Sequence, residues 1–93
     1  MSEIPLKFDV SPSYDQDKEI LRAAIIAELD AVNLYGQMAR LAKSEGIKEI
    51  LKDIAKEEKT HIGEFQSLLL AIDHEQKQEL ENGAKEVEEE LQK

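Results

Sequence analysis

The 93-residue sequence contains no cysteine. Neither a disulfide framework nor a thiolate metal site can therefore form, and any metal must be bound by oxygen and imidazole ligands. Cationic side chains are outnumbered by acidic ones, with 12 lysines and arginines against 21 aspartates and glutamates. The formal net charge is therefore −9. This balance argues against a nucleic-acid-binding surface, which needs clustered cations to neutralise phosphates. It suits the attraction of cations, or simply a solvated surface.

Long apolar runs are missing as well. No apolar run is longer than residues 68–72, a length far too short to span a bilayer, and residues 1–10 lack the pattern of a signal peptide. We therefore expect a cytoplasmic protein with no membrane association. A chain of 93 residues makes one small domain whose single core is only marginally sufficient, so its length alone makes oligomerisation plausible.

Proline is confined to positions 5 and 12, so no proline interrupts a helix in the rest of the chain. We expect residues 1–13 to form an N-terminal arm, residues 14–73 a helical hairpin domain, and residues 74–93 an acidic C-terminal helix or tail. The predicted fold class is all-α, an antiparallel two-helix hairpin followed by a short helix.

The helix boundaries follow from turn and capping signals. Ser13 with Gln16, and Asp73 with Gln76, form capping-box patterns that predict two helix starts. A polar break with a glycine, residues 43–46, is enough to reverse the chain direction. The sequence thus predicts helices over about 15–43, 47–72 and 75–91.

The first predicted helix is apolar over most of its circumference. A single partner helix covers about one apolar stripe, so the second face needs another surface to bury it. One face holds Leu21, Ala24, Ile25, Ala31, Val32, Tyr35, Ala39 and Ala42, and the adjoining face holds Ala23, Ala27, Leu34, Met38 and Leu41.

Charged residues interrupt the apolar face of both long helices. Glu58 and His61 stand three residues apart in the second helix, and Glu28 lies in the first. A desolvated, unpaired carboxylate would cost several kcal/mol, so each glutamate must be protonated, paired, turned to solvent or bound to a cation. Glu28 and Glu58 are the same number of residues from Lys43 at the break, Glu28 before it and Glu58 after it. An antiparallel hairpin therefore places the two carboxylates at the same level.

This set of ligands predicts a metal site. Carboxylate oxygens and a neutral imidazole suit Fe(II), Mn(II) or Zn(II), and carboxylates that bridge suit a pair of irons. One chain supplies only Glu28, Glu58 and His61, whereas a di-metal site in a helical bundle takes one Glu from each of two helices and a Glu-x-x-His from each of two others. Two copies complete that set, so we expect the site at a twofold interface that also buries the surplus apolar surface of the first helix.

Each of these residues also has a plainer interpretation. A single Glu on an apolar stripe is usually tilted to its edge or salt-bridged, and Glu-x-x-His arises by chance in a Glu-rich helix. Only their combination in register favours the metal. Tyr35, two turns after Glu28, is either a hydrogen-bonding or redox-active neighbour of the site or a core aromatic residue. Asp30 either gathers cations where subunits meet or is solvated, and His74 is expected at the surface.

Two sequence runs resemble one known family. They are Ala27-Glu28-Leu29-Asp30-Ala31-Val32-Asn33-Leu34-Tyr35 and Glu57-Glu58-Lys59-Thr60-His61. Together they resemble the encapsulated ferritins, short ferritin-like proteins housed in encapsulin nanocompartments, over roughly residues 17–75. The resemblance implies ferritin-like four-helix bundles formed by dimerisation, further assembly into a decameric ring, and a place in the cytoplasm inside an encapsulin shell.

The resemblance also implies an activity. It makes Glu28, Glu58 and His61 di-iron ligands with Tyr35 beside them, and it places Asp30 at an acidic position where metal enters. The implied enzyme is a ferroxidase that oxidises Fe(II) to Fe(III) with dioxygen for iron storage. From the ligand types we expect Zn, Mn or Ca as substitute metals. The chain lacks the C-terminal docking peptide of many members, which leads us to expect a shortened chain or a domain fused to a shell protein.

Two other functions stay open at this point. The hairpin could be a non-catalytic oligomeric cargo or structural module in which these residues bind a divalent cation such as Zn(II) or Ca(II). It could also be a rubrerythrin-like peroxidase with the same ligands. The absence of a Cys-x-x-Cys electron donor from the chain weakens the peroxidase interpretation.

Overall fold

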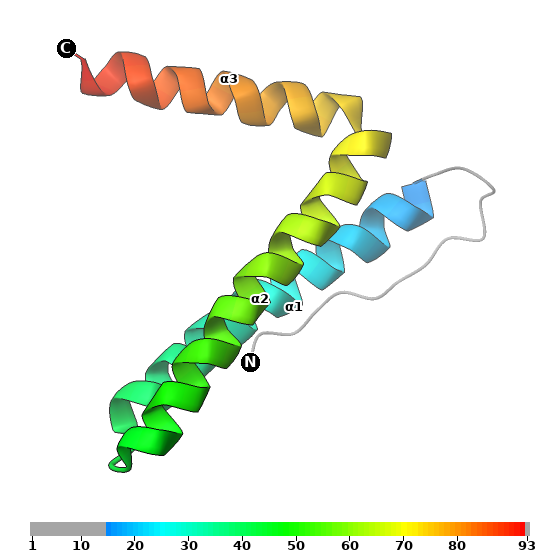
Figure 1. Cartoon of the computed structure of the whole chain (residues 1–93). Coiled ribbons are helices and arrows are strands. Elements are labelled where there is room, and N and C mark those ends of the chain that lie inside the picture. The colour runs from blue at the N-terminus through cyan, green and yellow to red at the C-terminus, as the bar shows by residue number, and fades with distance from the viewer. Residues whose placement is uncertain (1–14, 93) are drawn as a thin grey trace.

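The computed structural model describes residues 15–92 as three helices, with no strand in that range (Figure 1). Helix α1 spans Asp15–Leu41, α2 spans Glu45–Ile72 and α3 spans His74–Leu91. The predicted all-α fold is confirmed. The predicted arm over residues 1–13 and the predicted cap at Ser13 lie outside the described residues.

Helices α1 and α2 run antiparallel as a hairpin joined by a short turn (Figure 1). Helix α2 begins at Glu45, two residues before the predicted start, because the side chain of Ser44 accepts a hydrogen bond from the Ile47 amide and caps the first turn. Acidic Asp15 and Asp17 in the first turn of α1, and Arg40 in its last turn, match the helix dipole. Local signals therefore define both ends of the hairpin turn.

The single chain buries very little apolar surface. Among residues 15–92, only Ala23, Ala39 and Leu69 are buried apolar residues. The radius of gyration is 16.8 Å, whereas a compact chain of this length would measure about 12 Å. The surface therefore keeps many large apolar side chains. They are Ile20, Ile26, Leu29, Leu34, Met38, Leu41, Ile47, Ile50, Leu68, Leu80, Val87 and Leu91.

This exposure confirms the prediction that α2 alone cannot cover α1. Leu34, Met38 and Leu41, which we placed on the second face of α1, are all exposed. Ala23 of the same face is buried, so the exposed part of that face is its C-terminal half. None of the described helices has the length and hydropathy needed to cross a membrane.

The elbow between α2 and α3 is built around Asp73. Its amide donates to the Leu69 carbonyl at 2.8 Å, which ends α2, and its side chain accepts from the Gln76 amide at 2.9 Å, which starts α3. The predicted Asp73 cap is confirmed. The guanidinium of Arg22 on α1 donates to the same carboxylate at 2.5 Å. One buried carboxylate thus joins all three helices.

Helix α3 points away from the hairpin and has no buried residue (Figure 1). Its thin apolar seam includes Leu80, Val87 and Leu91, which are 44%, 59% and 80% exposed. An 18-residue helix with so few apolar contacts is marginal in water on its own. The single chain therefore leaves this seam uncovered.

Candidate metal centre

Three side chains from the two long helices meet on the hairpin. The Nδ1 atom of His61 lies 3.2 Å from Glu28 Oε2 and 3.5 Å from Glu58 Oε2. One ligand atom from each of the three residues lies within 4.8 Å of the others. Among residues 15–92, this is the one group of at least three histidine and acidic side chains placed to hold a metal ion.

The helix register explains why these residues meet. Helix α1 ends at Leu41 and α2 begins at Glu45. Glu28 lies as many residues before Leu41 as Glu58 lies after Glu45. Each carboxylate is therefore about 20 Å from the turn, at about 1.5 Å per residue. His61 is about one turn further along α2, within reach of both. The predicted juxtaposition of Glu28 and Glu58 is confirmed.

Partial burial gives the three side chains different access to solvent. Glu28 is 21% exposed, Glu58 is 17% exposed and His61 is 46% exposed. Two carboxylates held this closely in a partly desolvated place repel each other, and either a proton or a cation between them removes that repulsion. The Nδ1 atom of His61 lies between them and can act as a proton donor or, when it is deprotonated, as a metal ligand.

The donor chemistry fits iron but is incomplete for two metal ions. The three residues offer four carboxylate oxygens and one imidazole nitrogen. Such hard and borderline donors suit Fe(II), Mn(II) and Zn(II). Two ions that each take about four to six ligands would need about twice this number. The three residues therefore offer about half of the donors that a pair of metal ions would need.

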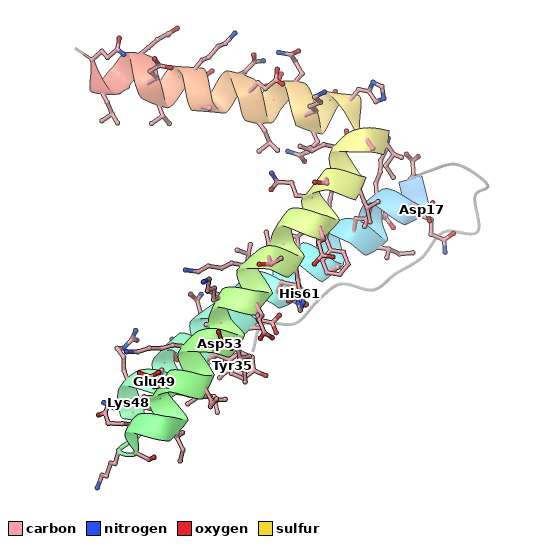
Figure 2. The ribbon with its side chains drawn as sticks, viewed as in Figure 1. Asp17, Tyr35, Lys48, Glu49, Asp53 and His61 are labelled. Carbon is pink, nitrogen blue, oxygen red and sulfur yellow. The ribbon has the colours of Figure 1, made fainter. Side chains whose placement is uncertain are left out.

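The other predicted site residues lie outside this cluster. Figure 2 shows Tyr35 on the hairpin between His61 and the α1–α2 turn, and the side chain of Tyr35 is half-buried. Asp30 is half-buried and already engaged with a partner. His74 is exposed at the start of α3, as expected. The proposed roles of Tyr35 and Asp30 stay predictions.

One flank of the hairpin is apolar and lies on the same side as His61. With about 100° per residue, His61 is turned about 60° from Glu58, and Ile50 and Leu68 are turned about 80° in the same sense. On α1 the equivalent side carries Leu34 and Met38. We call this surface the apolar flank. It consists of the exposed side chains of Ile20, Leu34 and Met38 on α1 and of Ile50 and Leu68 on α2.

Known proteins share this fold. The family model described as rubrerythrin matches residues 19–92. The crystal structure of the encapsulated ferritin domain from Pyrococcus furiosus superposes on this chain with a TM-score of 0.82 and 49% sequence identity, covering 96% of this chain and 91% of that one. The chain belongs to the encapsulated ferritin family. The family resemblance identified from the sequence is therefore confirmed.

Two curated proteins are also similar in sequence to this chain. A ferritin-like-encapsulin shell fusion protein of Pyrococcus furiosus is 61% identical over 71 residues, which are 76% of this chain and 21% of the relative. An encapsulin nanocompartment cargo protein of Myxococcus xanthus is 39% identical over 56 residues, which are 60% of this chain and 43% of the relative. The encapsulated ferritin chain thus matches about a fifth of the first relative and less than half of the second.

Proposed function

We propose that this encapsulated ferritin is a ferroxidase that binds two Fe(II) ions between paired protomers and oxidises them with dioxygen. The observation that supports the proposal is the cluster of Glu28, Glu58 and His61, which could supply half of a di-iron ligand set and lies beside an uncovered apolar flank. A second hairpin packed on that flank would bring the missing half of the ligands and bury the exposed apolar side chains together.

The ligand residues have separate tasks in this proposal. Glu28 would bridge the two ions, while Glu58 and His61 of each protomer would together ligate one ion. Four carboxylates would offset the repulsion between two cations and favour the more highly charged Fe(III) product. Each Fe(II) loses one electron, and dioxygen takes up two electrons and two protons to become hydrogen peroxide. The net charge of −9 would raise the local concentration of Fe(II).

We also infer a place for the product. Two relatives carry encapsulin in their names, one as a shell fusion and one as a cargo protein. This supports a protein that works in the cytoplasm inside an encapsulin shell and passes Fe(III) to that shell for storage. The ligand count supports the pairing of protomers, and the decameric ring stays an expectation from the family resemblance.

Fe(II) oxidation under air tests the activity. The ultraviolet absorbance of Fe(III) is followed for wild type, Glu28→Gln and Glu58→Gln, which keep side-chain size but lose a ligand charge. We expect the rate to fall at least about tenfold, since even outer-shell changes cost about 10–100-fold at metal sites. Unchanged rates would sink the ferroxidase proposal. Binding of Fe(II) without oxidation would instead favour a non-catalytic cation-binding module, and oxidation by peroxide alone would favour a peroxidase.

Native mass spectrometry with added Zn(II) tests the shared site. We expect metal to bind to even numbers of chains, with two ions per pair, and a chelator to release them. Glu58→Gln is the matched variant that should lose the metal-bound species. Monomers that bind two ions each would contradict the pairing.

A further inference from the structure

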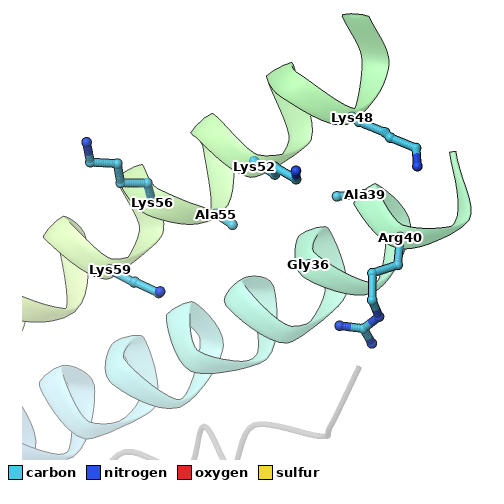
Figure 3. A pocket seen from close by; sticks show the side chains of 8 residues that line it. All are labelled: Gly36, Ala39, Arg40, Lys48, Lys52, Ala55, Lys56 and Lys59. Atoms are coloured by element: carbon cyan, nitrogen blue, oxygen red, sulfur yellow. The ribbon is translucent and has the colours of Figure 1, made fainter. Parts of the chain in front are cut away.

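Five cationic residues border one groove between α1 and α2, in the half of the hairpin that leads to the turn. Figure 3 shows that the side chains of Lys56 and Arg40 extend away from the gap between the two helices. The groove has a volume of about 350 Å³. Gly36, Ala39 and Ala55 supply its small, uncharged lining. We call it the basic groove, and its cationic residues are Arg40 of α1 and Lys48, Lys52, Lys56 and Lys59 of α2.

The basic groove lies on the side of the hairpin opposite the apolar flank. On α1, Gly36 and Arg40 are turned about 80° and 120° from Glu28, whereas Leu34 and Met38 are turned by similar angles in the other sense. A second hairpin that covers the apolar flank and completes the metal centre would therefore leave the basic groove open. A ligand in the groove would not compete for the metal ligands.

The cations of the basic groove have no anionic partner in the described part of the chain. No acidic residue lines the groove. The ion pairs within residues 15–92 involve Lys18, Arg22 and His61, and none involves a cation of the groove. Glu49 and Asp53 border a neighbouring hollow with two of the lysines but form no ion pair with them. Five unpaired cations in a chain with a net charge of −9 are a local reversal of the overall charge.

The spacing of the lysines makes them repel one another. Lys48, Lys52, Lys56 and Lys59 follow each other by one helical turn, so successive side chains are about 5–6 Å apart at Cβ. Like charges at this spacing destabilise a helix. A polyvalent anion between them would replace this repulsion by several attractive contacts, whereas a monovalent ion would satisfy only one or two cations.

We propose that the basic groove is a binding site for phosphate groups, supplied as inorganic phosphate or as a short polyphosphate. Lysine binds phosphate as a point charge, and the fork of Arg40 can donate two parallel hydrogen bonds to it. The volume falls within the roughly 300–1,000 Å³ of small-ligand sites. A helix of another copy would instead need an extended apolar groove, and this groove is rimmed by charge. The proposal does not depend on iron oxidation.

Phosphate binding is tested on the full metal-free chain. Inorganic phosphate and tripolyphosphate are titrated in a phosphate-free buffer and followed by calorimetry and phosphorus NMR. We expect one site per chain, tighter binding of tripolyphosphate, and weaker binding as NaCl is raised. Lys52→Gln with Lys56→Gln should weaken binding at least tenfold. Lys77→Gln with Lys85→Gln on α3 removes the same charge outside the groove and should leave the affinity unchanged.

Three outcomes would overturn the proposal. The first is no binding of either phosphate species by wild type. The second is equal weakening in the groove and α3 variants, which would mean that only net charge matters. The third is a groove variant that changes the oligomeric mass while phosphate has no effect, which would assign the groove to an acidic surface of another copy. Lys48→Gln with Lys59→Gln repeats the test if the first groove variant fails to fold by circular dichroism.

Discussion

His61 Nδ1 lies 3.2 Å from Glu28 Oε2, although 33 residues and the α1–α2 turn separate the two side chains along the chain. The same nitrogen lies 3.5 Å from Glu58 on its own helix. The imidazole therefore links a carboxylate of α1 to a carboxylate of α2 at one level of the hairpin. A metal ion held by these groups would tie the two helices together.

Replacement of His61 tests whether this histidine is part of the proposed metal centre. We expect His61→Ala to slow Fe(II) oxidation at least about tenfold, because it removes a proposed ligand and leaves two carboxylates with no donor between them. His74→Ala is the matched control, since His74 is the other histidine and is exposed at the start of α3. Stopped-flow absorbance under air measures both rates. Equal rates of Fe(II) oxidation in His61→Ala and His74→Ala would mean that His61 is not part of the site.

The apolar flank should control the pairing of protomers. Leu34→Glu puts a charge on this flank, whereas Leu29→Glu puts the same charge on the other side of α1, and both leucines are exposed in the single chain. Burial of a leucine contributes roughly 1.5–3 kcal/mol. We therefore expect Leu34→Glu to raise the dissociation constant of the dimer at least about tenfold and to slow Fe(II) oxidation in parallel.

Sedimentation equilibrium measures this change in pairing, and circular dichroism checks that the hairpin stays helical. Leu29→Glu should keep the wild-type dissociation constant. If Leu29→Glu raised the dissociation constant of the dimer more than Leu34→Glu, the pairing surface would lie opposite the apolar flank. That result would contradict the proposed shared site.

The sequence was sufficient to predict the hairpin and the cluster of Glu28, Glu58 and His61. Apolar periodicity and capping signals are local, so the three helices and the Asp73 cap could be predicted directly. The meeting of Glu28 and Glu58 is a long-range contact, but equal distances from one turn determine it. The error in the start of α2 came from Ser44, whose cap begins the helix before the first apolar residue.

Two features needed the structure because their partners are distant in sequence. Arg22 pairs with Asp73 across 51 residues, and nothing in the local sequence distinguishes Arg22 from the other polar residues of α1. Lys52, Lys56 and their neighbours follow a helical stripe whose sequence pattern is typical of a solvent-exposed face. Only the packing of α1 beside that stripe brings Arg40 to it and turns a face into a groove.

Acid should weaken the elbow through Asp73. The Gln76 amide and the Arg22 guanidinium, which both donate to this carboxylate, lower its pKa below the usual 3.8 in spite of burial. Because the folded-state pKa is the lower one, the charged carboxylate stabilises the fold above about pH 4, and this contribution is lost as the pH falls through the folded-state pKa. We therefore expect thermal stability and α3 helicity to decline on acidification below about pH 4.

Asp73→Asn isolates the charge, since asparagine still caps a helix but cannot ionise. The variant should have a lower melting temperature than wild type at neutral pH, and the difference should shrink as the pH falls below about 4. Asp53→Asn, at an exposed position within α2, is the control with the same chemical change and should follow the wild-type curve. Scanning calorimetry at stepped pH measures all three proteins. A constant offset between wild type and Asp73→Asn at every pH would mean that the cap geometry, rather than the charge paired with Arg22, stabilises the elbow.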